Sequence, residues 1–214
     1  MLASRFTRIA LAVLVCVVAC RPPRVTALPG MVVPDRRLPT GDLPTGHRKI
    51  VFLWELVDPD FSARGEGVAR VASPDSVRMD FFLGGGMGSG AAVLVGDSLR
   101  VPGADVARQL VPPRALLWAA LGRLQLPAER DTVVRVQDSL VRAEIGSPVH
   151  WRVTFRGDTL VRLERVAGGR LQEWVERSAG ARVKYRNEVT RRTLTLAIQR
   201  SDAVSAFDPA IWRF

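Results

Sequence analysis

Residues 151 to 159 read Trp151-Arg152-Val153-Thr154-Phe155-Arg156-Gly157-Asp158-Thr159. Apolar and polar side chains alternate as far as Arg156, which is the period of a β-strand with one buried face. Gly157 and Asp158 form a typical two-residue hairpin turn, after which the chain returns antiparallel to itself. This stretch therefore predicts a β-hairpin that packs one face against a core.

The same pattern recurs over most of the chain, from residues 49–54 to residues 193–199. Turn residues separate the alternating runs, as at Ser73 to Ser76, Gly96-Asp97 and Gly168-Gly169. We therefore expect about ten strands, joined mainly by hairpins. A sheet of this size with one apolar face must curl around a core or close on itself.

One segment between the strands has the pattern of a helix. Pro112-Pro113 can start it, Arg114 to Leu121 can form it, and Gly122 can end it in the left-handed conformation. Its apolar side chains cover much of the circumference: Leu116, Leu117, Trp118, Leu121 and, beyond its end, Leu124. Such a helix is expected to be buried on most sides or to sit over an apolar hollow. The expected fold is thus mainly β with α, a curved antiparallel sheet that forms an incomplete β-barrel lidded by an apolar helix.

The N-terminal residues have the features of an export signal. Arg5 and Arg8 supply a positive start, and residues 9–19 are apolar but too short to span a bilayer comfortably. The sequence Val17-Val18-Ala19-Cys20 resembles the lipobox of bacterial lipoproteins, which implies removal of residues 1–19 and lipidation of Cys20. An ordinary secretory signal or a short membrane anchor is the alternative.

Residues 20–47 contain six prolines, at positions 22, 23, 29, 34, 39 and 44, with glycines and few large apolar residues. This composition predicts an extended tether between the lipid and a folded domain at residues 48–214.

Several kinds of chemistry have no residues to support them. Cys16 and Cys20 are the only cysteines, and acylation would block the one left after processing. His47 and His150 are the only histidines, and neither has a companion at ligand spacing. We therefore expect no metal, no cofactor and no enzymatic activity. A hydrolase would need a buried serine or carboxylate beside His150.

Glycine and charge patterns also give no indication of a nucleotide or nucleic-acid site. Gly86, Gly88 and Ala91 match a loose dinucleotide motif, but a strand follows where that motif needs a helix. The formal net charge of +10 comes from basic residues scattered along the strands, so no nucleic-acid surface is expected. The excess of arginine over lysine is most simply a GC-rich coding bias, with attraction to anionic lipid headgroups as the alternative. Carboxylates that alternate with arginine on later strands predict cross-strand ion pairs: Glu144, Glu164, Glu173 and Glu176.

Together these features resemble the lipoprotein-localisation factor superfamily over about residues 50–214. Two stretches carry the resemblance. They are residues 64–101, above all Phe82-Leu83-Gly84-Gly85-Gly86, and residues 111–127. Members are incomplete β-barrels whose apolar cavity is lidded by helices, so the resemblance implies a protein that binds acyl chains. The side chains expected to line the cavity are Trp54, Phe82, Trp118, Leu121 and Trp151, with core packing as the alternative for each.

Lipidated Cys20 implies an anchored acceptor rather than a diffusing carrier. Arg21 follows the cysteine where an Asp would retain some lipoproteins at the inner membrane, so we expect the periplasmic face of the outer membrane. The implied cargo is acyl chains or lipoproteins, received from a periplasmic carrier, and Phe82, Leu83 and Met87 are the residues implied to contact the membrane during transfer. The alternative is a structural or assembly lipoprotein whose barrel is filled and docks an envelope partner.

Overall fold

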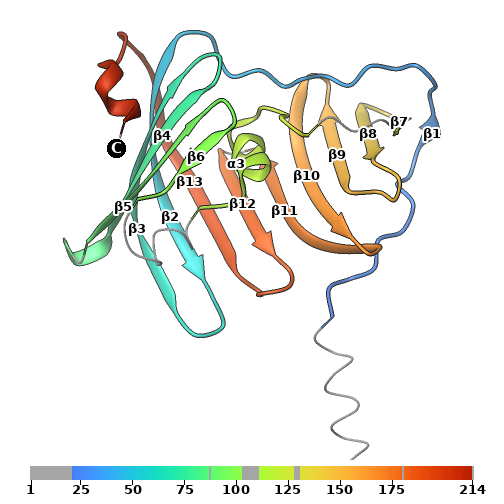
Figure 1. Cartoon of the computed structure of the whole chain (residues 1–214), viewed down its shortest axis with the longest axis horizontal. Coiled ribbons are helices and arrows are strands. Elements are labelled where there is room, and N and C mark those ends of the chain that lie inside the picture. Colours follow the sequence, from blue (N-terminus) through green and yellow to red (C-terminus); the bar gives the residue numbers. More distant parts are fainter. Residues whose placement is uncertain (1–20, 87, 103–110, 128–130, 180, 214) are drawn as a thin grey trace, which may run out of the picture.

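The computed structural model describes residues 21–86, 88–102, 111–127, 131–179 and 181–213. These residues form one antiparallel sheet of 13 strands that curves around a short helix (Figure 1). The elements are β1 (Met31–Val32), β2 (His47–Val57), β3 (Ser62–Ala72), β4 (Ser76–Leu83), η1 (Gly84–Gly86), β5 (Ser89–Val95), β6 (Ser98–Arg100), α3 (Arg114–Leu121), β7 (Thr132–Gln137), β8 (Leu140–Ile145), β9 (Trp151–Arg156), β10 (Thr159–Ala167), β11 (Arg170–Ser178), β12 (Arg182–Asn187), β13 (Thr193–Val204) and η2 (Pro209–Trp212).

The strand order is β1-β7-β8-β9-β10-β11-β12-β13-β2-β3-β4-β5-β6. Hairpins join β2 to β6 in one meander and β7 to β13 in another, as their turn residues predict. The meanders meet where β13 pairs with β2, for example at Leu196 and Trp54. Because β1 and β6 pair on one side only, the sheet is open, and the predicted incomplete barrel is confirmed.

Helix α3 lies inside the curve of the sheet, as Figure 1 shows. Ala115 to Ala120 are all buried, which explains why apolar residues occur around most of the helix circumference. Gly122 ends the helix with φ 103°, and its N–H donates to the carbonyl of Ala119 at 3.0 Å. The bounds and the burial predicted for this helix are confirmed.

The N-terminal strap, residues 21–46, differs from the free tether that its prolines suggested. It is extended, but it runs along the domain: β1 pairs with β7, and the Leu124 N–H donates to the Thr40 carbonyl at 2.8 Å. Leu43 is only 5% exposed and belongs to the main core. Proline removes an N–H donor but leaves its carbonyl free to accept, and the intervening leucines still gain from burial.

The convex face carries the expected ion pairs. Arg152 lies 2.8 Å from Glu144 on the neighbouring strand, and its guanidinium also donates to the Thr26 carbonyl of the strap. Arg162 lies 2.6 Å from Glu164 and also pairs with Glu176. These pairs account for the alternation of Glu and Arg along the later strands. Among the described residues, no helix has the length and apolar character needed to cross a bilayer.

Candidate functional site

The apolar interior lies between α3 and the concave face of the sheet. Side chains fill it, and the space that remains there is about 10 Å³. The residues around it are Met79, Phe81, Val111, Pro112, Leu117, Ala120, Val183, Tyr185, Leu194 and Leu196. All of these side chains except Tyr185 are apolar, so the interior has the chemistry of a site for a hydrocarbon chain. In this structure α3 fills that volume.

Polar contacts join the helix, and Arg123 just after it, to turns of the sheet. The Trp118 indole N–H donates to the Gly96 carbonyl at 3.3 Å, and Arg114 donates to the Asp97 carbonyl at 2.8 Å. Arg123 donates to the Pro74 carbonyl and stacks over Trp118, with its guanidinium carbon 5.1 Å from the ring centroid. No side chain caps the N-terminus of the helix. The contact between helix and sheet is therefore mainly apolar, with the arginine contacts at the rim and one hydrogen bond from the buried Trp118.

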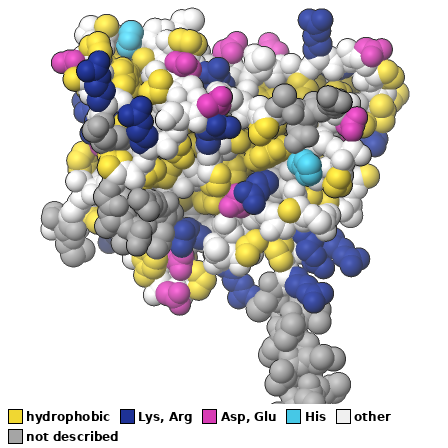
Figure 2. Space-filling view, viewed as in Figure 1, with side chains coloured by type: hydrophobic (Ala, Val, Ile, Leu, Met, Phe, Trp, Pro, Cys, Tyr) yellow, Lys and Arg dark blue, Asp and Glu magenta, His cyan; other side chains and the backbone are white. Residues whose placement is uncertain are grey.

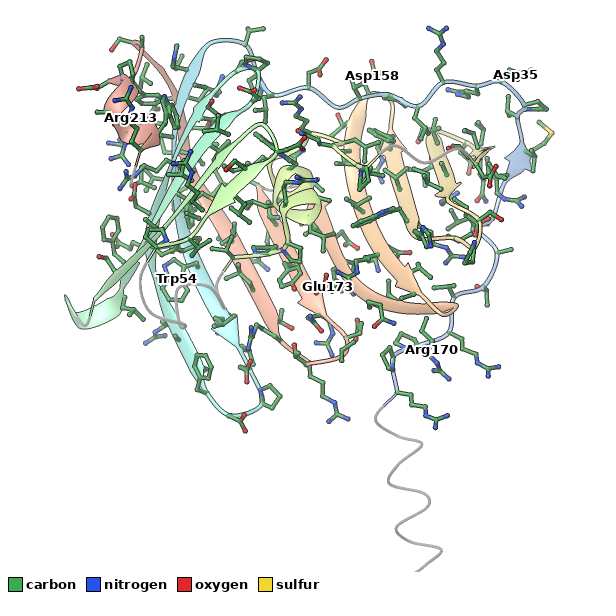
Figure 3. All side chains as sticks on the ribbon, in the orientation of Figure 1. Asp35, Trp54, Asp158, Arg170, Glu173 and Arg213 are labelled. Carbon is green, nitrogen blue, oxygen red and sulfur yellow. The ribbon has the colours of Figure 1, made fainter. Side chains whose placement is uncertain are left out.

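A polar cluster lies on β11 and β12 at the edge of this interior. Glu173 is 8% exposed and accepts from the Tyr185 hydroxyl at 3.3 Å and from the Asn187 amide at 2.8 Å. Arg165 reaches its second carboxylate oxygen at 3.6 Å, an ion pair without a hydrogen bond. Burial first, and then the charge of Glu173, raise the pKa of Tyr185 to about 12. The cluster gives the otherwise apolar interior one polar edge (Figure 3).

Burial also lowers the pKa of Arg177, whose side chain reaches the end of the helix. A methyl group added to Gly122 would lie 2.3 Å from its Nη1 atom. This places a cation beside the C-terminus of α3, where the helix dipole favours positive charge.

The roomier spaces are open hollows near the β2–β3 hairpin. One has a volume of about 600 Å³ and is lined by Leu53, Trp54, Glu55, Arg64, Gly65, Glu66, Gly84, Arg182, Thr195 and Ala197. A second, of about 580 Å³, shares Glu55, Arg64 and Gly84 with the first. Four charged side chains line the larger hollow, so it suits an acyl chain less well than the interior does.

The side chains predicted to line a cavity do not come together in one. Trp54 is 2% exposed and Trp118 is fully buried, and both belong to the main core. Leu121 and Trp151 are half-buried and pack against that core from its edges. Phe82 lies opposite exposed Glu66 on β3. Because paired residues share a face of the sheet, Phe82 also points outward and is 46% exposed. With α3 in its observed position, Trp54, Trp118, Trp151 and Leu121 therefore pack in or against the core rather than line an open cavity.

Of the residues implied to contact the membrane, Leu83 packs partly against the core beside exposed Phe82. Met87 and Cys20 lie outside the described residues. Sequence reasoning predicted an ion pair for Glu173, which Arg165 supplies, but missed its contacts with Tyr185 and Asn187, although the only tyrosine of the chain stands on an alternating strand beside it. Within the described ranges, no group of histidine, cysteine and acidic side chains could hold a metal ion.

No protein-family model and no curated protein matches the sequence. Solved structures do match in fold. One is a LolA superfamily protein of Nitrosomonas europaea, with a TM-score of 0.55 and 10% identity over 79% of this chain and 91% of that chain. Another is a domain described as an outer membrane lipoprotein-sorting protein, from Vibrio parahaemolyticus, with a TM-score of 0.51 and 7% identity over 80% of this chain and 91% of that chain. The fold of the chain is therefore LolA-like.

Proposed function

From a LolA-like fold whose apolar interior is closed by one helix, we propose that this protein binds acyl chains on the concave face of its sheet. The observation that supports this most is the apolar lining of the interior, where α3 leaves only about 10 Å³ free. An acyl chain would take the place of α3, whose mainly apolar contact with the sheet is restrained by polar contacts at the rim. No catalytic step is needed.

The energetics favour exchange of one apolar occupant for another. Each buried methylene contributes roughly 0.8 kcal/mol, so a long acyl chain offsets much of what the sheet loses when Leu116, Leu117 and Trp118 move away. The net affinity is the difference between these terms, and release into a membrane that offers the same burial costs little. Transfer can therefore be passive.

A fluorescent fatty acid tests the exchange. The Arg114→Ala/Arg123→Ala variant removes two polar restraints on the helix ends, and both arginines lie at the surface. If α3 must move, weakening its restraints raises the population of the open form, and the apparent affinity should increase about threefold to tenfold. The control is Arg200→Ala, which removes an exposed ion pair with Asp202 remote from the helix. Uptake that is absent, or equal in all three proteins, contradicts the proposal.

A specific observation also favours the second function, a structural or assembly lipoprotein with a filled barrel that docks an envelope partner. The small volume under α3 is what a permanent core would have. This function predicts that neither the wild type nor the Arg114→Ala/Arg123→Ala variant takes up fatty acid. It also predicts that the fatty acid leaves the unfolding free energy unchanged.

We further propose that residues 1–19 are a signal, that Cys20 is lipidated and that the domain faces the periplasm at the outer membrane. The protein would accept lipoproteins from a periplasmic carrier or insert them, with the Phe82 to Met87 hairpin in contact with lipid. Mass spectrometry of the N-terminal peptide tests the lipid: Cys20→Ser should abolish both the added mass and membrane fractionation. An unmodified wild-type peptide that begins before Cys20 would overturn it.

A further inference from the structure

The N-terminal strap leaves the domain at a defined end of the sheet. Here the Val25 N–H donates to the Gly169 carbonyl at 3.0 Å, and the Leu171 N–H donates to the Pro23 carbonyl at 2.9 Å. These bonds fix Arg21, the first described residue, beside the β10–β11 turn. Figure 1 shows the β2–β3 and β12–β13 turns at the same lower edge. We call this edge of the sheet, with its three turns, the anchor end.

Apolar side chains are exposed at the anchor end. Val57 and Phe61, in the β2–β3 hairpin, are 46% and 36% exposed, and Val189, in the β12–β13 turn, is 56% exposed. The two turns are joined, because Arg192 pairs with Asp58 at 2.7 Å. The Asn187 side chain accepts from the Val189 N–H at 3.0 Å, which orders this turn. The apolar residues are thus held outward on ordered turns rather than folded into the core.

Basic side chains lie at the part of the anchor end where the strap leaves the domain. Exposed Arg21 and Arg24 and half-buried Arg170 lie where the strap leaves, and Figure 2 shows Lys and Arg side chains at the lower right of the view, with Asp and Glu side chains at the lower left. Asp60 is the exposed acid of the β2–β3 turn. Four turns at the opposite end carry an aspartate, namely Asp75, Asp97, Asp138 and Asp158, whereas the described residues of the β11–β12 turn are alanines; Figure 3 labels Asp158 at the upper edge and Arg170 at the lower. An anionic surface would therefore attract the part of the anchor end where the strap leaves the domain.

We propose that the anchor end docks on the anionic surface of a phospholipid bilayer. Val57, Phe61 and Val189 enter the interfacial zone, and Arg21 and Arg24 contact headgroup phosphates. The sheet then stands upright on the membrane with its aspartate turns away from it. The inference rests on the proposed function only in that Cys20, which directly precedes Arg21, brings this end to the membrane. Apolar side chains and basic charge together supply the second attachment that a lipid anchor needs for stable orientation.

Hydrogen exchange tests the docking without a bulky label. The chain from Cys20 onward keeps all of the described residues, and its single thiol can be coupled to a maleimide lipid. The coupled chain is placed in vesicles of phosphatidylethanolamine and phosphatidylglycerol, and its exchange is compared with that of the uncoupled chain in solution. We expect slower exchange at residues 57–61 and 188–192 on the vesicles, and no change at residues 157–159.

Charge substitutions separate docking from mere proximity to the membrane. Phe61→Asp and Val189→Asp should each lose most of the slowing, whereas Ala179→Asp, which adds the same charge at the exposed opposite end, should keep it. Equal exchange at both ends, or slowing that survives both anchor-end substitutions, overturns the proposal. Because the coupling supplies the lipid and no cargo is present, failure of lipidation in the cell or of fatty acid uptake does not change this result.

Discussion

Truncation of Leu43 to alanine tests whether the N-terminal strap is part of the folded domain. This leucine lies between two prolines of a segment with the composition of a tether, yet it is 5% exposed and packs in the main core. Gly41 fixes the strap beside it, because a methyl group there would lie 2.5 Å from the Gly122 carbonyl oxygen. The Leu43→Ala variant should therefore leave a cavity that the strap cannot easily close.

The size of the effect follows from the burial of the side chain. Removal of a buried leucine side chain costs about 2 to 5 kcal/mol of unfolding free energy, and a site at the edge of the core belongs in the lower part of that range. For a domain of this size, such a loss lowers the melting temperature by roughly 5 to 15 °C. The matched control is Leu53→Ala, because Leu53 is 45% exposed and the same atoms are removed. Its cost should stay below about 1 kcal/mol.

Urea unfolding followed by tryptophan fluorescence measures both variants, with equal slopes required for the comparison. If residues 21–46 were a free tether, Leu43→Ala would change the unfolding free energy by no more than about 0.5 kcal/mol. A result that small, or one equal to that of Leu53→Ala, would refute the packing of the strap.

Other substitutions test single contacts by the same unfolding assay. Gly122→Ala should cost about 1 to 3 kcal/mol, because the residue has φ 103° and its new methyl group would meet Arg177. Arg152→Ala should cost about 2 to 4 kcal/mol, because it leaves Glu144 without its 2.8 Å partner; a cost near zero would mean that the pair is solvated. The pKa of Tyr185 is raised from 10.0 to about 12, so the stability that its neutral phenol contributes is complete below pH 10 and is lost as the pH rises towards 12. Relative to Tyr185→Phe, the wild type should thus lose roughly 2 kcal/mol across that range, and parallel pH profiles would contradict the raised pKa.

Prediction of the strands succeeded where the signal was local. The alternation in β9, the Gly157-Asp158 turn and the helix between Pro113 and Gly122 are all encoded within a few residues of one another. The short strand β1 was missed, because two residues carry no period and its pairing with β7 depends on residues about a hundred positions away. The same reason explains the strap, whose burial depends on the end of α3 and on arginines of later strands.

The candidate site was harder to predict than the fold. Phe81, Phe82 and Leu83 are three consecutive apolar residues, so alternation does not say which face is inside. The register with β3 resolves this, because Phe81 lies opposite Gly67 and faces the core while Phe82 lies opposite Glu66 and faces solvent. Trp54 and Trp118 lie on the apolar faces that their sequence positions indicated. Only the tertiary packing shows that α3 fills the space inside the concave face of the sheet.

Local sequence was sufficient for the hairpins, helix α3 and the apolar face that makes the sheet curl, because strand period, turn residues and helix ends depend on neighbouring residues. Tertiary structure was needed for the junction of β13 with β2, the course of the proline-rich strap, the closed interior and the gathering of apolar and basic residues at the anchor end. Those features depend on contacts between residues far apart in the chain, and no local pattern specifies which distant partners offer complementary shape and charge.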